Sequence, residues 1–134
     1  MKVETLLKAV AMGERLGHVF VATADRAGLP HLAAAGKLKL GVNNRLLVSA
    51  WFCPGTVANL DQNQRVSLVV WDPGQDAGFQ LLGTTERIEE MAMMDGIAPG
   101  RESAPLPQVQ RRLHIRVDKI LDFKHAPHSD QEEN

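Results

Sequence analysis

Hydrophobic and polar residues alternate along most of the chain in the pattern of short β-strands. The segments rich in valine, leucine, isoleucine and aromatic residues are 18–24, 31–42, 45–51, 65–71, 79–89 and 112–123. Clusters of Asp, Asn, Gly and Pro, which favour turns, separate most of them. Asn43 and Asn44 tolerate a positive φ, so they predict a tight hairpin turn between the second and third segments.

Helical spacing is confined to short stretches. Four apolar residues near the N-terminus recur at helical intervals: Val3, Leu6, Leu7 and Val10. They predict an amphipathic helix, which Gly17 ends. Residues 54–63 predict one or two further helical turns, because a proline opens them and apolar residues follow three apart. Residues 90–96 favour another short helix.

Two strands carry signs of irregularity. Gly83 interrupts the segment 79–89, and the apolar alternation of 112–123 changes phase midway, so each predicts a bend or bulge. Six β-segments with few long helices indicate a mainly β fold, an antiparallel barrel that is closed or nearly closed, with short peripheral helices. Such a barrel leaves little interior volume, so a ligand would bind at its surface or at an interface.

Length and charge narrow the class of protein. The 134 residues suit one domain, which we place at 1–124. The polar residues 125–134 contain too few apolar side chains to pack and predict a flexible tail. A formal net charge of −1 gives no reason to expect nucleic acid or a membrane surface as partner. No apolar run approaches the ~20 residues of a membrane span, and no signal peptide is apparent, so we expect a cytoplasmic protein.

The link between the third and fourth strands is longer than a hairpin needs. It uses about a dozen residues, with Gly55 and Thr56 at the start of the predicted helix. Free backbone N–H groups and a hydroxyl at a helix start can hold an anion, and a glycine lets a phosphate approach. Thr56 could equally be only a helix cap, and Gly55 only part of a turn.

Several stretches together resemble the FMN-binding split β-barrels of the pyridoxamine 5′-phosphate oxidase-like group, especially its small FMN-binding proteins. The stretches are "GHVFVATADRAGLPHL", "NNRLLVSAW", "GTVANLDQNQRVSLVVWD" and "GFQLLGTTERIE". The resemblance implies a split barrel of about six strands. The family pattern Lys-Thr-x-x-Asn-Leu here reads Gly55 to Leu60, so the lysine is missing. Lys37, Lys39 and Arg45 are candidates to replace it.

The same resemblance implies the place of the cofactor. The family's second strand presents its backbone to the flavin ring, and three alanines and a glycine here leave room for a flat ring. The end of the third strand lies along the ribityl chain, and the turn after it holds the phosphate. The implied cofactor-binding residues are Ala33, Ala34, Ala35, Gly36, Lys37, Ser49, Ala50, Trp51, Gly55, Thr56 and Asn59. The four small residues could also simply face a crowded neighbour.

The resemblance implies an FMN-dependent oxidoreductase that is a homodimer, with the cofactor at the subunit interface. The substrate and the electron donor are not implied, and no residue stands out as an acid or base. Two alternatives stay open. One is a non-catalytic FMN-binding or electron-transfer protein. The other is a barrel that binds haem, a deazaflavin or no cofactor. The absence of the family lysine is the feature that supports this second alternative.

Other chemistry has weak support. Cys53 is the only cysteine, so no internal disulfide is possible, and without a paired histidine it favours packing over nucleophilic catalysis. His125 and His128 have a spacing that could bind a metal, but no third ligand lies near them, so we predict no metal site. Trp51 and Trp71 suit a barrel or interface position.

Overall fold

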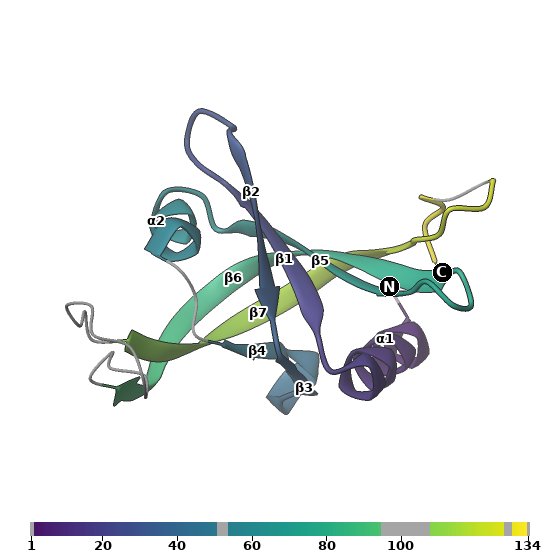
Figure 1. Ribbon diagram of the computed structural model, residues 1–134, viewed down its shortest axis with the longest axis horizontal. Coiled ribbons are helices and arrows are strands. Elements are labelled where there is room, and N and C mark those ends of the chain that lie inside the picture. The colour runs from purple at the N-terminus through teal and green to yellow at the C-terminus, as the bar shows by residue number, and fades with distance from the viewer. Residues whose placement is uncertain (1, 51–53, 95–107, 128–129, 134) are drawn as a thin grey trace, which may run out of the picture.

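The computed structural model describes residues 2–50, 54–94, 108–127 and 130–133 (Figure 1). The helices are α1 (Val3–Leu16) and α2 (Pro54–Gln62), with a short 3-10 turn, η1 (Val42–Asn44). The strands are β1 (Val19–Ala24), β2 (Pro30–Ala35), β3 (Lys37–Leu40), β4 (Leu46–Ala50), β5 (Arg65–Asp72), β6 (Ala77–Met94) and β7 (Gln108–Asp122).

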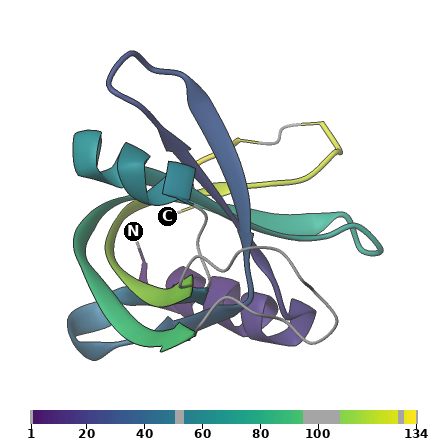
Figure 2. The same cartoon turned by 60° about the vertical axis from the view of Figure 1, so that its left-hand side comes forward.

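All seven strands form one antiparallel sheet in the order β2-β1-β5-β6-β7-β4-β3. Only Gly36 separates β2 from β3 in the chain, so the two outermost strands of the sheet are consecutive. The sheet therefore curls round on itself, as Figure 2 shows, and the predicted antiparallel split barrel is confirmed. The predicted second strand is present as β2 and β3, divided at that glycine.

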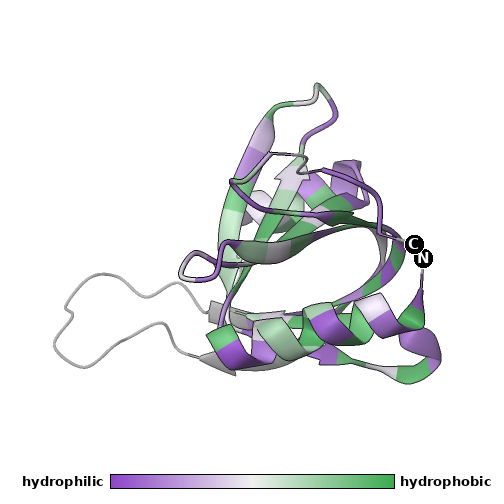
Figure 3. Cartoon of the chain, turned by 90° about the vertical axis from the view of Figure 1, so that its right-hand side faces the viewer, coloured by the Kyte–Doolittle hydropathy of each residue, from purple (hydrophilic) through white to green (hydrophobic). Residues whose placement is uncertain are grey.

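The barrel interior is filled by aliphatic side chains from every strand and from α1. The largest fully buried ones are Leu6, Leu46, Leu68, Leu81, Leu113, Ile115 and Ile120. Helix α1 contacts β3 and β5, and its buried side packs on the core residues Leu38 and Val70 (Figure 3). Burial of these apolar side chains is the main force that holds the strands in a closed curve.

The N-terminal helix is confirmed, but its buried face is rotated from the predicted one. Leu6 and Val10 are buried as expected, whereas Val3 and Leu7 are 43% and 48% exposed. Gly13 explains the rotation, because a Cβ at that position would lie 2.6 Å from Leu38 Cδ2. The small residues of α1 therefore bring that side of the helix against β3.

The predicted turns and bulges agree with the structure. Gly17 ends α1 with φ +77°, and Asn43 and Asn44 both have φ 57°. The pairing of β6 with β7 shifts between Leu82 and Gly83, which leaves Asp118 as the extra residue of β7. The bulge in β7 thus lies opposite the bend in β6.

The helix predicted at 90–96 is wrong for its described part. Residues 90–94 continue β6, where Met94 pairs with Gln108. Long-range pairing between two long strands overrides the weak local helical preference. Residues 95 and 96 lie outside the described part of the chain.

The C-terminal residues fold back along β7. Leu121 forms an isolated bridge with Glu132, and the backbone N–H groups of His125 and Ala126 donate to the carboxylate of Asp76. The flexibility of 125–134 stays a prediction, as does the domain boundary at 124.

Candidate functional site

The predicted ring-binding strand ends at the edge where β2 turns into β3. Ala34 is exposed, Ala33 is half-buried, and Ala35 is 4% exposed and belongs to the core. A Cβ at Gly36 would meet nothing within 4 Å, so open space lies in front of it. Ala34 and Gly36 are exposed at this edge, with Phe20 of β1 paired opposite Ala34, whereas Ala33 lies on the same side of β2 as Ala35.

The register of the sheet brings Lys37 and Ser49 together. Lys37 pairs with Ser49 across β3 and β4, and Ser49 pairs with Arg112 across β4 and β7. All three residues line a recess of about 120 Å³ on the outer face of the barrel. The complete lining is Lys37, Lys39, Leu47, Ser49, Met91, Gln110 and Arg112.

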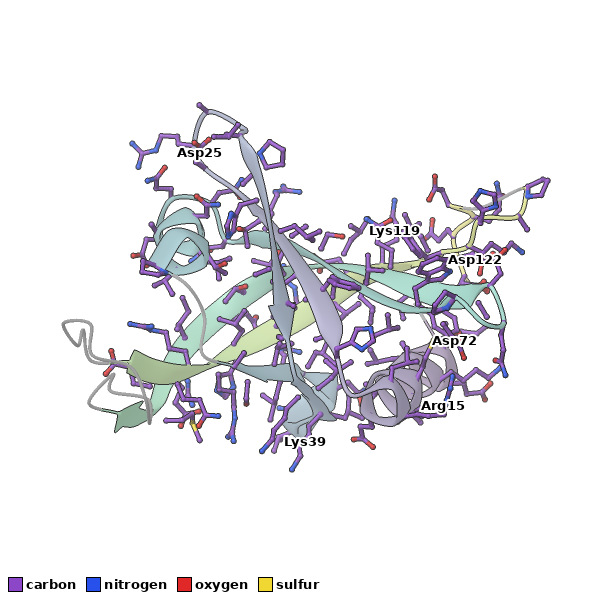
Figure 4. All side chains as sticks on the ribbon, in the orientation of Figure 1. Arg15, Asp25, Lys39, Asp72, Lys119 and Asp122 are labelled. Atoms are coloured by element: carbon purple, nitrogen blue, oxygen red, sulfur yellow. The ribbon has the colours of Figure 1, made fainter. Side chains whose placement is uncertain are left out.

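The recess is positively charged. Among the described residues, no carboxylate lies within ion-pair distance of Lys37 or Lys39, and no acid lines the recess. Arg112 donates from Nε to Ser49 Oγ at 3.3 Å and lies 3.9 Å from Glu89. The side chain of Lys39 points away from the barrel into solvent (Figure 4). Three cations and a hydroxyl can therefore bind one small oxyanion.

Arg45 does not join this group. Its guanidinium binds Glu86 through Nε and through Nη2, the latter 3.4 Å from Oε2. Arg45 precedes β4, whereas Lys37 lies opposite the far end of that strand. Of the three candidates for the missing lysine, Lys37 and Lys39 are thus the two that share a recess.

A charge network borders the recess on β6 and β7. His114 Nε2 lies 2.9 Å from Glu89 Oε1 and 3.2 Å from Arg87 Nη2. The hydrogen bond with His114 lowers the pKa of Glu89, and Arg87 and Arg112 act in the same direction. The carboxylate therefore stays ionised and orients the guanidinium of Arg112 towards Ser49.

Sequence reasoning missed Arg112, Glu89 and His114 as neighbours of Lys37. Their positions in the chain give no motif, because the cluster forms only through the register β3-β4-β7-β6. The alternation in β7 does indicate which of its polar residues face outward. It does not indicate which residues of other strands lie beside them, because that depends on which strands pair.

The start of α2 lies next to β2. Gly55 is exposed and has no positive φ, and a Cβ there would lie 3.7 Å from His31 Cε1. Thr56 is fully buried. Asn59 donates from Nδ2 to Thr23 Oγ1 at 3.1 Å, which ties α2 to β1. His31 is thus the basic side chain that faces the glycine.

The remaining predicted residues are placed as follows. Ala50 is half-buried at the end of β4 and pairs with Arg111. Trp51 and Cys53 lie outside the described residues. In the described part of the chain, no three His, Cys, Asp or Glu side chains gather as a metal site. Among those same residues, no helix has the length and apolar character that crossing a membrane requires.

Comparison with known proteins identifies the family. Residues 8–122 match the sequence model of the pyridoxamine 5′-phosphate oxidase family, and the chain belongs to this family. No curated protein matches the sequence significantly.

Solved structures share the fold at low identity. HupZ of Group A Streptococcus is 17% identical with a TM-score of 0.65, and the match covers 96% of this chain and 98% of HupZ. A pyridoxamine 5′-phosphate oxidase-related, FMN-binding protein of Nostoc punctiforme is 12% identical with a TM-score of 0.63, over 90% and 83% of the two chains. An F420 reductase is 17% identical with a TM-score of 0.59, over 82% and 93%.

Proposed function

We propose that this protein binds FMN and acts as a cytoplasmic flavin-dependent oxidoreductase of the pyridoxamine 5′-phosphate oxidase type. The observation that carries the proposal is the open edge at Ala33–Gly36, flanked by groups that can bind an anion, in a chain of this family. The flavin would supply the redox chemistry, and the protein would bind and orient it.

The ring of FMN would lie against the backbone of Ala33, Ala34 and Gly36, beside the half-buried Phe20 that pairs with Ala34 from β1. The phosphate has two possible positions. One is the start of α2, at Gly55 and Thr56, with His31 beside it. The other is the recess of Lys37, Lys39 and Arg112. His31 and Lys37 are six residues apart, roughly 20 Å along an extended strand, so one phosphate cannot use both.

A flavin titration tests the proposal. Purified protein should bind FMN with quenching of flavin fluorescence, and it should bind riboflavin, which lacks the phosphate, at least tenfold more weakly. Lys37→Gln weakens FMN if the recess holds the phosphate, and leaves it unchanged if the start of α2 does. Lys8→Gln, on the exposed side of α1, is the matched control. Equal affinity for FMN and riboflavin in all variants would contradict a phosphate site.

We also propose a homodimer with the cofactor at the interface. Leu29 and Leu32 are 69% and 65% exposed on the β1–β2 hairpin, which projects from the barrel beside the proposed ring position (Figure 1). A second copy that covers these two leucines would gain free energy from burial of their apolar surface. Sedimentation should show a dimer at micromolar concentration. A monomer that retains FMN would contradict the shared site.

A second candidate function is binding of a different cofactor. Gly55 in place of the family lysine favours it, and one structure of similar fold is an F420 reductase. Absorption spectra of the protein titrated with FMN, with F420 and with haem separate the candidates. Turnover with a nicotinamide as electron donor separates an enzyme from an electron carrier, because a carrier accepts electrons without substrate-dependent nicotinamide oxidation.

A further inference from the structure

A second concave site lies on the outer face of β1, β5, β6 and β7. This groove has a volume of about 460 Å³, within the size range of small-molecule sites. It contains none of the residues predicted for the cofactor. Lys119, which lines it, and Lys39, which lines the cationic recess, lie on opposite sides of the molecule in Figure 4.

Small side chains make the floor of the groove. Ala22 pairs with Ser67, and Ser67 pairs with Leu82, so one cross-strand row runs across the floor to Lys119. Ala22, Ser67 and Leu82 are each half-buried. The Oγ of Ser67 accepts a hydrogen bond from Gln80 Nε2 at 2.8 Å, which leaves its own hydroxyl hydrogen to donate. The floor is therefore flat and mainly apolar, with one available donor.

The bulge in β7 builds one wall. Because Asp118 is the extra residue, the consecutive side chains of Asp118 and Lys119 are both exposed and both line the groove. In a regular strand, two consecutive side chains would point to opposite faces. Bulges that redirect side chains in this way are over-represented next to binding sites.

The charges that line the groove are not balanced. Asp118 accepts from Arg116 Nε at 3.0 Å, and Thr84 lies 3.4 Å away, so this carboxylate is engaged. Arg65 and Lys119 have no ion-pair partner among the described residues. The two cations lie on β5 and β7, two strand spacings apart and two residues out of register, roughly 12 Å between their backbones, so their long side chains can reach one anionic group.

We propose that this groove binds a small organic anion with a flat apolar body, of the aromatic carboxylate class. The apolar body rests on Ala22 and Leu82, and the carboxylate is held by Arg65 and Lys119, with the hydroxyl of Ser67 as a further donor. The groove shares no residue with the proposed flavin site, so this proposal does not depend on whether the protein binds FMN.

The test uses 2-naphthoate as probe and 2-naphthylmethanol, which has the same rings without the charge, as its control. Both are titrated into ¹⁵N-labelled protein, and amide chemical shifts are followed. The expected result is a saturable shift of the Ser67, Leu82 and Lys119 amides with 2-naphthoate and a much smaller shift with the alcohol. Saturating FMN should leave the 2-naphthoate affinity unchanged.

Variants separate the charge from the shape. Arg65→Gln and Lys119→Gln should each weaken 2-naphthoate by about 1.5-fold to fivefold, the range of solvent-accessible ion pairs, and should not alter binding of the alcohol. Ala22→Leu should weaken both probes, because it fills the floor. Lys8→Gln on α1 is the matched control for loss of a surface charge, and melting temperatures show that each variant is folded.

Three results would overturn the proposal. The first is 2-naphthoate affinity unchanged in both Arg65→Gln and Lys119→Gln. The second is displacement of 2-naphthoate by FMN, which would merge the groove with the flavin site. The third is absence of saturable 2-naphthoate binding while dilution of the protein alone shifts the same amides, which would make the groove an interface between two copies of this chain.

Discussion

Ala34 and Ala35 are neighbours in β2 with opposite surroundings. Ala34 is exposed on the outer side of the strand, and Ala35 is packed in the barrel core with Val19 opposite it. In the sequence, nothing distinguishes these alanines, and all of them were expected to lie at the flavin ring. The structure divides the run of alanines into a surface that could face a flavin ring and a core position that cannot contact the ring with its side chain.

This division gives a test of the ring position. Ala34→Leu should weaken FMN at least tenfold, because the added side chain occupies the space of the ring, and should change the free energy of unfolding by less than about 0.5 kcal/mol. Ala35→Leu should instead destabilise the fold by about 1–3 kcal/mol through overpacking. Flavin titration and urea denaturation measure both effects. FMN affinity unaffected by Ala34→Leu would place the ring elsewhere.

Gly55 offers a second residue-scale test. Its backbone has no positive φ, and a Cβ would make only ordinary contacts with His31, at 3.7 and 3.8 Å, so a lysine fits there without strain. If the phosphate lies at the start of α2, Gly55→Lys should tighten FMN by about one to two powers of ten through a charge-assisted hydrogen bond. Riboflavin should gain nothing, and the gain should shrink at high salt.

The control for this prediction is Gly55→Met, which adds a side chain of similar length without charge. Equal effects of lysine and methionine would mean that packing, not charge, changes the affinity. An unchanged FMN affinity in Gly55→Lys, together with weaker binding in Lys37→Gln, would move the phosphate to the recess.

At the scale of elements, Gly83 sets the contact between β6 and β7. A Cβ there would lie 2.3 Å from the backbone oxygen of Arg116, closer than any real contact. Gly83→Ala should therefore cost about 1–3 kcal/mol of unfolding free energy, because β7 must move. Gly36→Ala is the matched control, since a Cβ at Gly36 meets nothing within 4 Å. Urea denaturation followed by circular dichroism measures both, and equal stability of the two variants would contradict the close approach.

The sequence predicted the individual strands, turns and helices better than it predicted which strands pair with one another. The turn at Asn43 and Asn44 and the bulge at Gly83 were predictable, because each depends on one residue's own backbone freedom. The extension of β6 to Met94 was not, because it depends on pairing with a distant strand. The recess was missed for the same reason, since Lys37 and Arg112 meet only through the order of the sheet.

At the scale of the whole molecule, Asp76 joins the β5–β6 turn to the C-terminal residues. The hydrogen bond from the backbone N–H of His125 is the main cause that lowers the pKa of Asp76, and those from Ala126 and Trp71 add to it. Asp76 has φ 48°, a conformation that asparagine also tolerates. The carboxylate of Asp76 thus holds the C-terminal residues against the turn. Because asparagine also adopts this φ, Asp76 can be replaced by asparagine without straining the turn.

A carboxyl group with a lowered pKa in the folded state stabilises the fold above its ordinary pKa of 3.8 and loses that contribution as the pH falls through the lowered value. We expect amide exchange of His125 and Ala126 to rise only below pH 3.8. Asp76→Asn keeps the turn and should remove the pH dependence. Release of the tail at or above pH 3.8, or an unchanged pH profile in Asp76→Asn, would contradict this role.

The strand order also determines when the chain can fold during synthesis. The hairpins β1–β2 and β3–β4 are made first, yet neither pairs directly with the other. β1 needs β5, and β4 needs β7, which is the last strand. A nascent chain that ends before β7 can pair β2-β1-β5-β6, but it leaves β3–β4 as an isolated hairpin, which is marginally stable at best. The barrel cannot close until β7 emerges from the ribosome, an interval in which chaperones can bind the exposed apolar faces.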